Sequence, residues 1–362
     1  MRIESDIKLD FCDVLIKPKR SESPSRHNVH LVRNFRFNNS SSLLSCVPII
    51  AANMSTVGTF NMAKALAKHK MLTCLHKFYD VERLIEFWSE DPASQFTFYT
   101  LGIKDDDFSK LEVFSKNIKN LKLICIDVAN GYTNFFVDKV KKIRDKFPDS
   151  IILAGNVATP EMVQQLILNG GADIIKIGIG PGSVCTTRIV TGVGYPQLSA
   201  TIECADSAHG LRGHVCADGG CTTSGDIAKA FGAGADFVML GGILSGHEEC
   251  EGEWEYGPEL IGNKISETDD GAVKMVKKKL KFYGMSSKDA MENHYGGQAD
   301  YRAAEGKCVE VAYKGLVDKT LNEIQGGLRS ACTYVGTEKL KDFSKCCTFV
   351  RVARTHNSVY GG

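Results

Sequence analysis

The chain has 362 residues, and its charges nearly balance, with 44 Lys plus Arg against 43 Asp plus Glu. A chain of this length can bury a large core, and single barrel domains of about 250 residues are common, so we expect one large domain over residues 1–362. The balanced charge supplies no large positive field, which argues against extended contacts with nucleic acid. We therefore expect a small-molecule ligand.

The first residues, MRIESDIKLDF, alternate charged and apolar side chains, and no run of 18 apolar residues occurs in the chain. This pattern argues against a signal peptide or a membrane-spanning segment. The 13 cysteines are odd in number and have no metal-ligand spacing, which is typical of reduced thiols. We expect a cytosolic (cytoplasmic) protein in which most cysteines are small core residues.

Eight short apolar runs have the composition of buried parallel strands, and segments with helical periodicity follow several of them. The predicted strands lie at residues 47–54, 71–77, 96–102, 121–129, 150–156, 172–178, 214–220 and 235–242. Helices are predicted at residues 60–69, 135–147, 160–169 and 224–234. This alternation favours the α/β class with a closed (β/α)8 TIM barrel over an open doubly wound sheet, although the pattern alone is compatible with both.

A barrel places its site at the carboxyl ends of its strands, and polar or glycine residues follow the predicted strands there. These residues are Asn53, Lys77, Asp127, Asn156, Gly180, Asp218 and Gly241. Any one of them is most simply an ordinary turn residue. Their recurrence at corresponding places predicts a shared site at this end of the barrel.

Two stretches lie outside the strand and helix repeat. Residues 250–281 are polar, charged and interrupted by Gly and Pro, which predicts a long, partly flexible insertion after the eighth strand. Its basic end, VKKKLK, is typical of a solvated face, with a phosphate or partner site as the alternative. After Lys281, Gly- and Ser-punctuated segments form a C-terminal extension that ends in a predicted surface strand at 348–354.

The segment 178–197, GIGPGSVCTTRIVTGVGYPQ, follows a predicted strand and contains five glycines. Pro181 and the later glycines prolong a loop where a dinucleotide fingerprint would begin a helix, so that interpretation is weak. The alternative is a catalytic loop that presents Cys185. Neighbouring backbone amides and Arg188 could favour the thiolate form of Cys185, which would make it a nucleophile. The alternative is that Cys185 is an inert thiol.

The segment 217–242 joins the last two predicted strands, where barrels often bind phosphate through backbone N–H groups. The pairs Gly219–Gly220 and Gly241–Gly242 suit that role because they add no side-chain bulk. Asp218 could accept hydrogen bonds from two ribose hydroxyls. Tight packing at the barrel rim is the alternative explanation of both glycine pairs.

Several long motifs resemble those of a known family. They are KLDFCDVLIKPKR, ANMSTVGTF, IDVANGY, AGNVAT, GPGSVCTTR, ECADSAHGL, DGGCTTSGDIAKAFGAGADFVMLGG, YGMSS, YRAAEGK and GGLRSACTYVG, and they extend over nearly the whole chain. The chain resembles the GMP reductases of the IMP dehydrogenase/GMP reductase superfamily. The resemblance implies a (β/α)8 barrel, usually a homotetramer, and NADPH-dependent conversion of GMP to IMP and ammonia in purine interconversion.

The resemblance also distinguishes two related reactions. Between the second and third predicted strands the chain has only VERLIEFWSEDPASQ, which leaves no room for the regulatory CBS domains usual in IMP dehydrogenases. The CTTR and YRAAEGK forms also favour the reductase. IMP oxidation with NAD and a non-catalytic guanine-nucleotide sensor are the alternatives. The insertion at 250–281 is longer than the resemblance leads us to expect.

The resemblance implies roles for individual residues. Cys185 would bond covalently to the purine as a thioimidate, and Thr187 with Glu305 would relay protons. The implied GMP-binding residues are Ser183, Asp218, Gly219, Gly220, Gly241, Gly242, Gly284, Met285, Ser286, Arg302, Ala303, Ala304, Glu305 and Gly306. The implied NADPH-binding residues are Lys77, Asp127, Val128, Ala129, Ile179, Gly180, Met285, Tyr301 and Arg302, with Ser25, Arg26, Ser330, Ala331, Cys332 and Thr333 from a neighbouring subunit or the rim. A monovalent cation (K+) would be held in the loop of Gly180, Gly182, Cys185 and Arg188.

Overall fold

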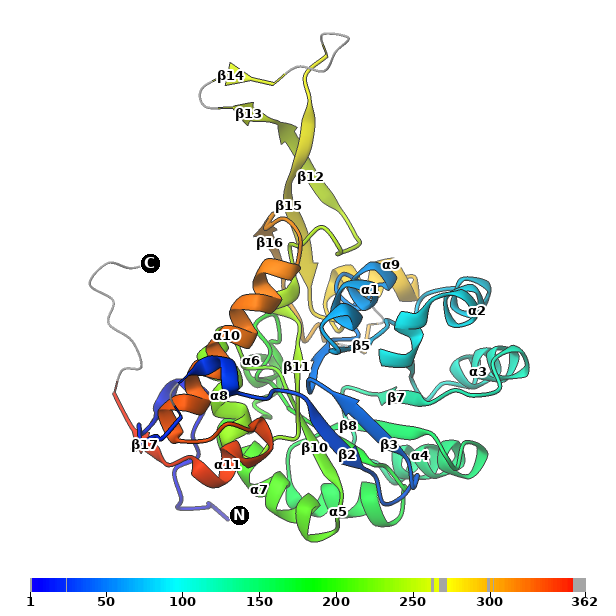
Figure 1. Ribbon diagram of the computed structural model, residues 1–362. Helices are drawn as coiled ribbons and strands as arrows, with labels where there is room; N and C mark the ends of the chain where they lie inside the picture. Colours follow the sequence, from blue (N-terminus) through cyan, green and yellow to red (C-terminus); the bar gives the residue numbers. More distant parts are fainter. Residues whose placement is uncertain are drawn as a thin grey trace.

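A computed structural model of the chain describes residues 2–23, 25–261, 264–266, 272–297, 300–301 and 303–353. Eight parallel strands close into a barrel in the order β10-β11-β4-β5-β6-β7-β8-β9 (Figure 1). Their bounds are β4 Ile49–Ala51, β5 Leu72–Cys74, β6 Thr97–Leu101, β7 Leu123–Asp127, β8 Ile151–Val157, β9 Ile174–Ile177, β10 His214–Asp218 and β11 Phe237–Leu240. All eight predicted strands and the (β/α)8 class are confirmed.

Helices surround the barrel and connect successive strands. They are α1 Phe60–Lys68, α2 Val81–Glu90, α3 Asp105–Asn117, α4 Asn134–Lys146, α5 Pro160–Leu168, α7 Gln197–Gly210 and α8 Ser224–Gly232. The four helices predicted from periodicity are confirmed as α1, α4, α5 and α8. Each buries an apolar stripe against the strands; α4, for example, buries Phe136, Val140 and Ile143 at spacings of four and three residues.

The C-terminal extension contains a helix that the sequence prediction missed. Helix α10, Asp318–Val335, packs against α8 and buries Leu321, Ile324 and Leu328. The Gly326–Gly327 pair inside it obscured the helical pattern, because glycine is a poor helix former. A Cβ at Gly327 would lie 2.6 Å from Ser224 Oγ, so the close approach of the two helices requires a glycine there.

The remaining elements close or decorate the barrel. The hairpin of β2 Arg33–Arg36 and β3 Leu43–Cys46 packs Phe35 on Phe237, with ring centroids 4.4 Å apart. Strand β1 Val14–Ile16 pairs with β17 Phe349–Arg351, which confirms the predicted surface strand; residue 354 lies outside the described residues. Short helices are η1 Phe11–Asp13, η2 Arg26–Asn28, η3 Pro92–Phe96, η4 Gly242–Leu244, α6 Thr187–Thr191, α9 Lys288–Tyr295, η5 Leu340–Asp342 and α11 Phe343–Cys346.

The insertion follows β11 as predicted, but its described residues are not irregular. They form a twisted β-ribbon that projects from the barrel (Figure 1). Its strands are β12 Trp254–Pro258, β13 Leu260–Ile261, β14 Lys264–Ile265 and β15 Met275–Tyr283, and β16 Cys308–Ala312 pairs with β15 at the base. Three of the four lysines of VKKKLK form ion pairs with glutamates: Lys277 with Glu248, Lys279 with Glu310 and Lys281 with Glu253, so most of their charge is balanced locally.

None of the described helices combines the length and the apolar character that a membrane crossing requires.

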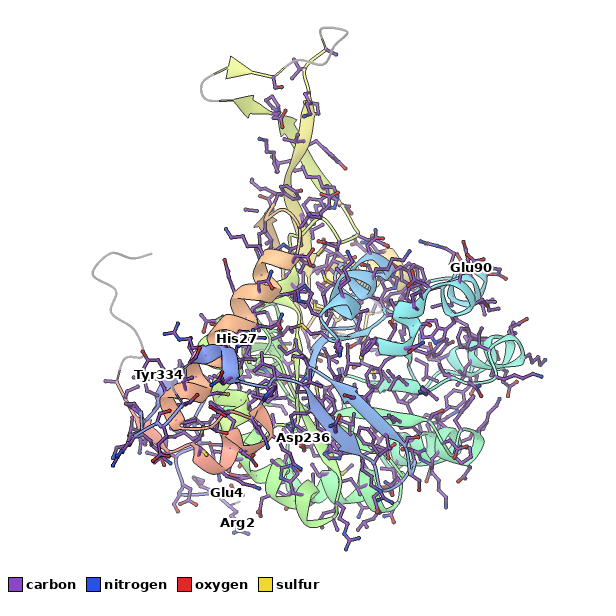
Figure 2. All side chains as sticks on the ribbon, in the orientation of Figure 1. Arg2, Glu4, His27, Glu90, Asp236 and Tyr334 are labelled. Carbon is purple, nitrogen blue, oxygen red and sulfur yellow. The ribbon has the colours of Figure 1, made fainter. Side chains whose placement is uncertain are left out.

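A buried carboxylate ties the amino-terminal end of the barrel together. Asp236, which is labelled in Figure 2, directly precedes β11. It contacts Arg33 Nη2 at 2.9 Å and His209 Nε2 at 2.8 Å and accepts a hydrogen bond from Val215 N–H at 3.2 Å. Burial alone would raise the pKa of Asp236, but the hydrogen bonds from the two histidines, His209 and His214, and the nearby Arg33 charge hold it well below its usual range.

We expect Asp236→Ala to lower the free energy of unfolding at pH 7 by about 3–5 kcal/mol, because the largely buried Arg33 guanidinium would lose its carboxylate partner and keep its hydrogen bond to the backbone carbonyl of residue 236. A carboxyl whose pKa is depressed in the folded state stabilises it above about pH 4, and that contribution is lost as pH falls. Urea unfolding should therefore separate wild type and variant widely at pH 7, and the separation should begin to narrow below about pH 4 and be smaller at pH 3. An equal difference at both pH values would contradict the assignment.

Candidate functional site

A cavity of about 480 Å³ opens at the carboxyl ends of the barrel strands. All seven residues that follow the predicted strands line it: Asn53, Lys77, Asp127, Asn156, Gly180, Asp218 and Gly241. Each comes from a different strand, so the closed barrel brings together residues far apart in the chain.

The loop after β9 presents Cys185 to this cavity, where its side chain is half-buried. The loop is fixed from one side by the YRAAEGK segment. Cys185 forms an antiparallel bridge with Gly306, Thr186 N–H donates to Glu305 O at 3.0 Å, and Lys307 N–H donates to Val184 O at 2.9 Å. A segment about 120 residues away in sequence thus forms one wall of the thiol's environment.

Three side chains form a continuous polar chain at the cavity. Cys185 Sγ lies 3.3 Å from Thr187 Oγ1, and Thr187 Oγ1 donates to Glu305 Oε2 at 2.7 Å. The three residues that the resemblance named as catalytic therefore lie within direct contact of one another. A carboxylate bound to a hydroxyl can move a proton toward a third group that the hydroxyl faces.

An ion pair fixes the other side of the loop. Arg188 Nη1 donates to Asp10 Oδ2 at 2.8 Å, and Arg188 Nη2 donates to Tyr195 O at 2.7 Å. A Cβ at Gly194 would lie 2.6 Å from Arg188 Cγ, so the arginine stem fills the space beneath the loop. In the structure the charge of Arg188 is paired with Asp10. No sequence pattern indicated Asp10, which lies 178 residues before its partner Arg188.

We expect Asp10→Asn to lower kcat/KM about ten- to hundredfold, because small displacements of a reacting group are costly. Steady-state kinetics with saturating cofactor would measure the loss. Asp6→Asn, in an exposed part of the same segment, is the matched control and should behave as wild type. Unchanged kcat/KM in the Asp10 variant would show that the ion pair does not hold the loop.

Glycines shape another part of the cavity wall. Gly219 and Gly220 have φ values of +88° and +84°, which other residues rarely adopt, and both line the cavity. A Cβ at Gly242 would lie 2.9 Å from Ser183 Oγ, so the Ser183 loop and the turn after β11 approach closely. Backbone N–H groups beside such glycines can bind a phosphate without steric hindrance.

The remaining predicted ligand residues divide by position. Those that also line the cavity are Val128, Ala129, Ile179, Gly182, Gly284, Met285 and Ser286. Gly306, Ala303, Ala304 and Arg188 lie in segments beside it, and Arg302 lies outside the described residues. Tyr301 is 90 % exposed.

Two predicted cofactor segments lie beside each other but away from the cavity. The short helix η2, which begins after Ser25, packs on α10, the helix that carries Ser330, Ala331, Cys332 and Thr333. Cys332 is fully buried in the core, so its side chain is unavailable to a ligand. In a single chain these residues do not line the cavity.

Sequence reasoning missed several residues of the cavity. Lys176 lines its floor, and Phe78, Lys104 and Tyr295 line its outer part, where Lys104 Nζ lies 4.8 Å from the Tyr295 ring centroid. The one available signal was Lys176 itself, a lysine within the apolar run ADIIKIG.

The described part of the chain has no group of three or more His, Cys, Asp or Glu side chains that could hold a metal ion. The cation loop implied by the resemblance would instead use backbone carbonyls. Gly182 O accepts a hydrogen bond from Cys185 N–H at 3.0 Å, and a carbonyl oxygen has a second lone pair free for a cation. Arg188 could contribute its backbone carbonyl to such a site but not its side chain, because the guanidinium is itself a cation.

Comparison with known proteins agrees with this geometry. The family model described as the IMP dehydrogenase / GMP reductase domain matches residues 8–359. The chain is 54 % identical to GMP reductase 1 of Rattus norvegicus over 361 residues and to GMP reductase 1 of Homo sapiens over 360 residues, covering 99 % of each chain. It is also 54 % identical to GMP reductase of Edwardsiella ictaluri over 363 residues, covering 100 % of this chain and 99 % of that one. The chain belongs to the IMP dehydrogenase/GMP reductase family.

Proposed function

We propose that this protein reduces GMP to IMP and ammonia with NADPH, as part of purine nucleotide interconversion. The observation that carries the proposal is the contact chain from Cys185 through Thr187 to Glu305 at the mouth of a cavity fit for a nucleotide. The names of relatives that match over the full chain support the same reaction.

The reaction divides into two steps. The Cys185 sulfur bonds to carbon 2 of the guanine ring, the bond from that carbon to the exocyclic nitrogen breaks, and ammonia leaves. Carbon 2 of the resulting thioimidate then receives a hydride, the carbon–sulfur bond breaks, and its electron pair returns to the sulfur. Covalent attachment replaces one difficult substitution by two easier steps.

Ammonia is a poor leaving group unless its nitrogen is protonated, and this defines the task of Thr187 and Glu305. A threonine hydroxyl alone is a weak acid at neutral pH. Because Thr187 donates to the Glu305 carboxylate, it can pass protons between that carboxylate and the departing nitrogen. The backbone hydrogen bond from Thr186 N–H to Glu305 O holds the two segments together, so the side chains of Thr187 and Glu305 stay in contact.

The nucleotide would lie between the thiol and the glycine turns. Gly219, Gly220, Gly241, Gly242 and Ser183 would hold the phosphate, and Asp218 would bind ribose hydroxyls. Both contacts that Asp218 makes through its side chain fall on Oδ2, from Asn156 Nδ2 at 2.9 Å and Lys176 Nζ at 3.0 Å, so Oδ1 is the oxygen available to a ribose.

The cofactor would occupy the part of the cavity near β5 and β7, and when bound its reduced nicotinamide supplies the hydride. Lys77 is half-buried there, and its Nζ lies 3.9 Å from Asp107 Oδ2. Lys104 and the rings of Phe78 and Tyr295 also line this part of the cavity, which suits a ligand with phosphate and aromatic groups. We infer NADPH as the form used. The protein would be a homotetramer in which a neighbouring copy contributes Ser25, Arg26 and Ser330–Thr333 to the cofactor site. It would act in the cytosol.

A potassium ion is proposed for the loop of Gly180, Gly182 and Cys185. The oxygen ligands there are of the type that hard monovalent cations prefer, and the neighbouring Arg188 charge is neutralised by Asp10. The expected result is higher activity in potassium than in an equal concentration of a large organic cation.

One assay tests the proposal. NADPH absorbance should fall when GMP is added, with one ammonia released per NADPH consumed. NADH production from IMP and NAD without ammonia would instead identify an IMP dehydrogenase. GMP binding without turnover under either condition would identify a nucleotide sensor.

A further inference from the structure

A lysine lies buried on the floor of the cavity, between two carboxylates. Lys176 is the third residue of β9, and only 3 % of its surface is exposed. Its Nζ lies 2.5 Å from Asp127 Oδ1 at the end of β7 and 3.0 Å from Asp218 Oδ2 at the end of β10. Both carboxylates line the cavity.

The two carboxylates belong to different halves of the proposed site. Asp218 lies on the nucleotide side, beside Gly219, whereas Asp127 lies on the cofactor side, beside Val128. The ammonium group of Lys176 therefore contacts one carboxylate from each half of the site, and it lies at the cavity floor, shielded from solvent.

The surroundings keep this lysine charged. Burial alone would lower the pKa of Lys176, but Asp127 and Asp218 raise it well above its usual range, so the side chain does not serve as a base. Burial would likewise raise the pKa of Asp127, and Lys176 overcomes that effect and lowers it. The other titratable groups that face this cluster are Cys74, Cys125 and Cys216 from neighbouring strands, Cys221 after β10, and Lys77.

We infer that Lys176 is a positioning residue that fixes the Asp218 and Asp127 carboxylates for the nucleotide and the cofactor. The inference rests on the proposed function. Asp218 Oδ2 is held by Lys176 and Asn156, which orients Oδ1 for the ribose, and Asp127 is held from the same nitrogen. Lys176 acts through these carboxylates and needs no contact with either ligand.

Removal of the ammonium would leave two half-buried carboxylates with no shared cation. Like charges in a partly buried site cannot both remain ionised easily, so one of them gains a proton at a higher pH than before. A protonated Asp218 is a weaker acceptor for ribose hydroxyls. GMP affinity should then fall, and fall further as the pH is lowered.

The test is a double-mutant cycle on GMP binding, measured by calorimetry without cofactor between pH 8 and pH 6. Lys176→Met should weaken GMP binding about ten- to hundredfold at pH 7, because hydrogen bonds to charged groups contribute that much. The loss relative to wild type should grow toward pH 6. Because the GMP phosphate itself titrates near pH 6, the ratio of the two Kd values is compared at each pH.

Three further variants make the result specific. In an Asp218→Asn background, Lys176→Met should change the Kd for GMP by less than about twofold, since the residue through which Lys176 acts is already neutral. Lys176→Arg should restore most of the affinity. Arg33→Met, which breaks the buried ion pair at the opposite end of the barrel, should lower stability and leave the Kd for GMP unchanged.

Each outcome decides the inference. If Lys176→Met does not fold, the Lys176→Met/Asp127→Asn variant, which restores the net charge of the cluster, takes its place in the cycle. A loss of affinity of the same size in the Asp218→Asn background, or no loss at all, would overturn the positioning role while wild-type GMP binding upheld the proposed function. Absence of GMP binding by the wild-type protein would overturn both.

Discussion

Cys185→Ala is expected to abolish GMP reduction, with a decrease in kcat of at least about a thousandfold, while GMP still binds. The sulfur is the only protein atom that bonds to the purine in the proposed mechanism, so no partial route replaces it. NADPH oxidation followed by absorbance would measure the loss. Acid-quenched wild-type protein should show a mass increase from the bound purine, and the variant should show none.

The control is Cys12→Ala, because Cys12 is an exposed thiol outside the cavity. It should retain full activity and the same adduct. A variant without the Cys185 thiol that still turns over, or a wild-type reaction mixture with no adduct, would contradict covalent catalysis. Of the proposed function, only nucleotide binding would then remain supported.

The barrel could be predicted because each of its strands is an apolar run buried on both faces. The composition of runs such as 150–156 is typical of buried parallel strands. In a closed barrel, the residues that follow such strands all lie at the same end. This is why Asn53, Asp127 and Asp218 could be placed in one site before any distance was known. Local pattern and closed topology were sufficient for that step.

Features that depend on long-range pairs could not be predicted in the same way. The Asp10–Arg188 ion pair and the bridge of Lys176 between two carboxylates join positions on separate elements, and no spacing in the sequence indicates them. Helix α10 was missed for a related reason, since the glycines that obscure it are explained only by its contact with α8. The insertion has the polar composition of a loop because its β-ribbon is largely solvated.

Glu305→Gln is expected to slow deamination by about a hundredfold to ten-thousandfold and to slow hydride transfer by less than about tenfold. Glutamine can still accept the hydrogen bond from Thr187, so the loop geometry is kept, but it cannot take up or supply a proton. Rapid-quench measurement of ammonia in a single turnover reports the first step. The deuterium isotope effect from labelled NADPH reports the second, and it should be suppressed because deamination becomes rate-limiting.

The matched control is Glu310→Gln, an exposed glutamate five residues further along that pairs with Lys279 and should leave both steps unchanged. Thr187→Val should reproduce the Glu305 defect, since it interrupts the same relay between carboxylate and amine. If both steps slowed equally in the Glu305 variant, the carboxylate would be acting on loop structure. The assignment of Glu305 as the proton source for ammonia requires that deamination alone carry the large loss.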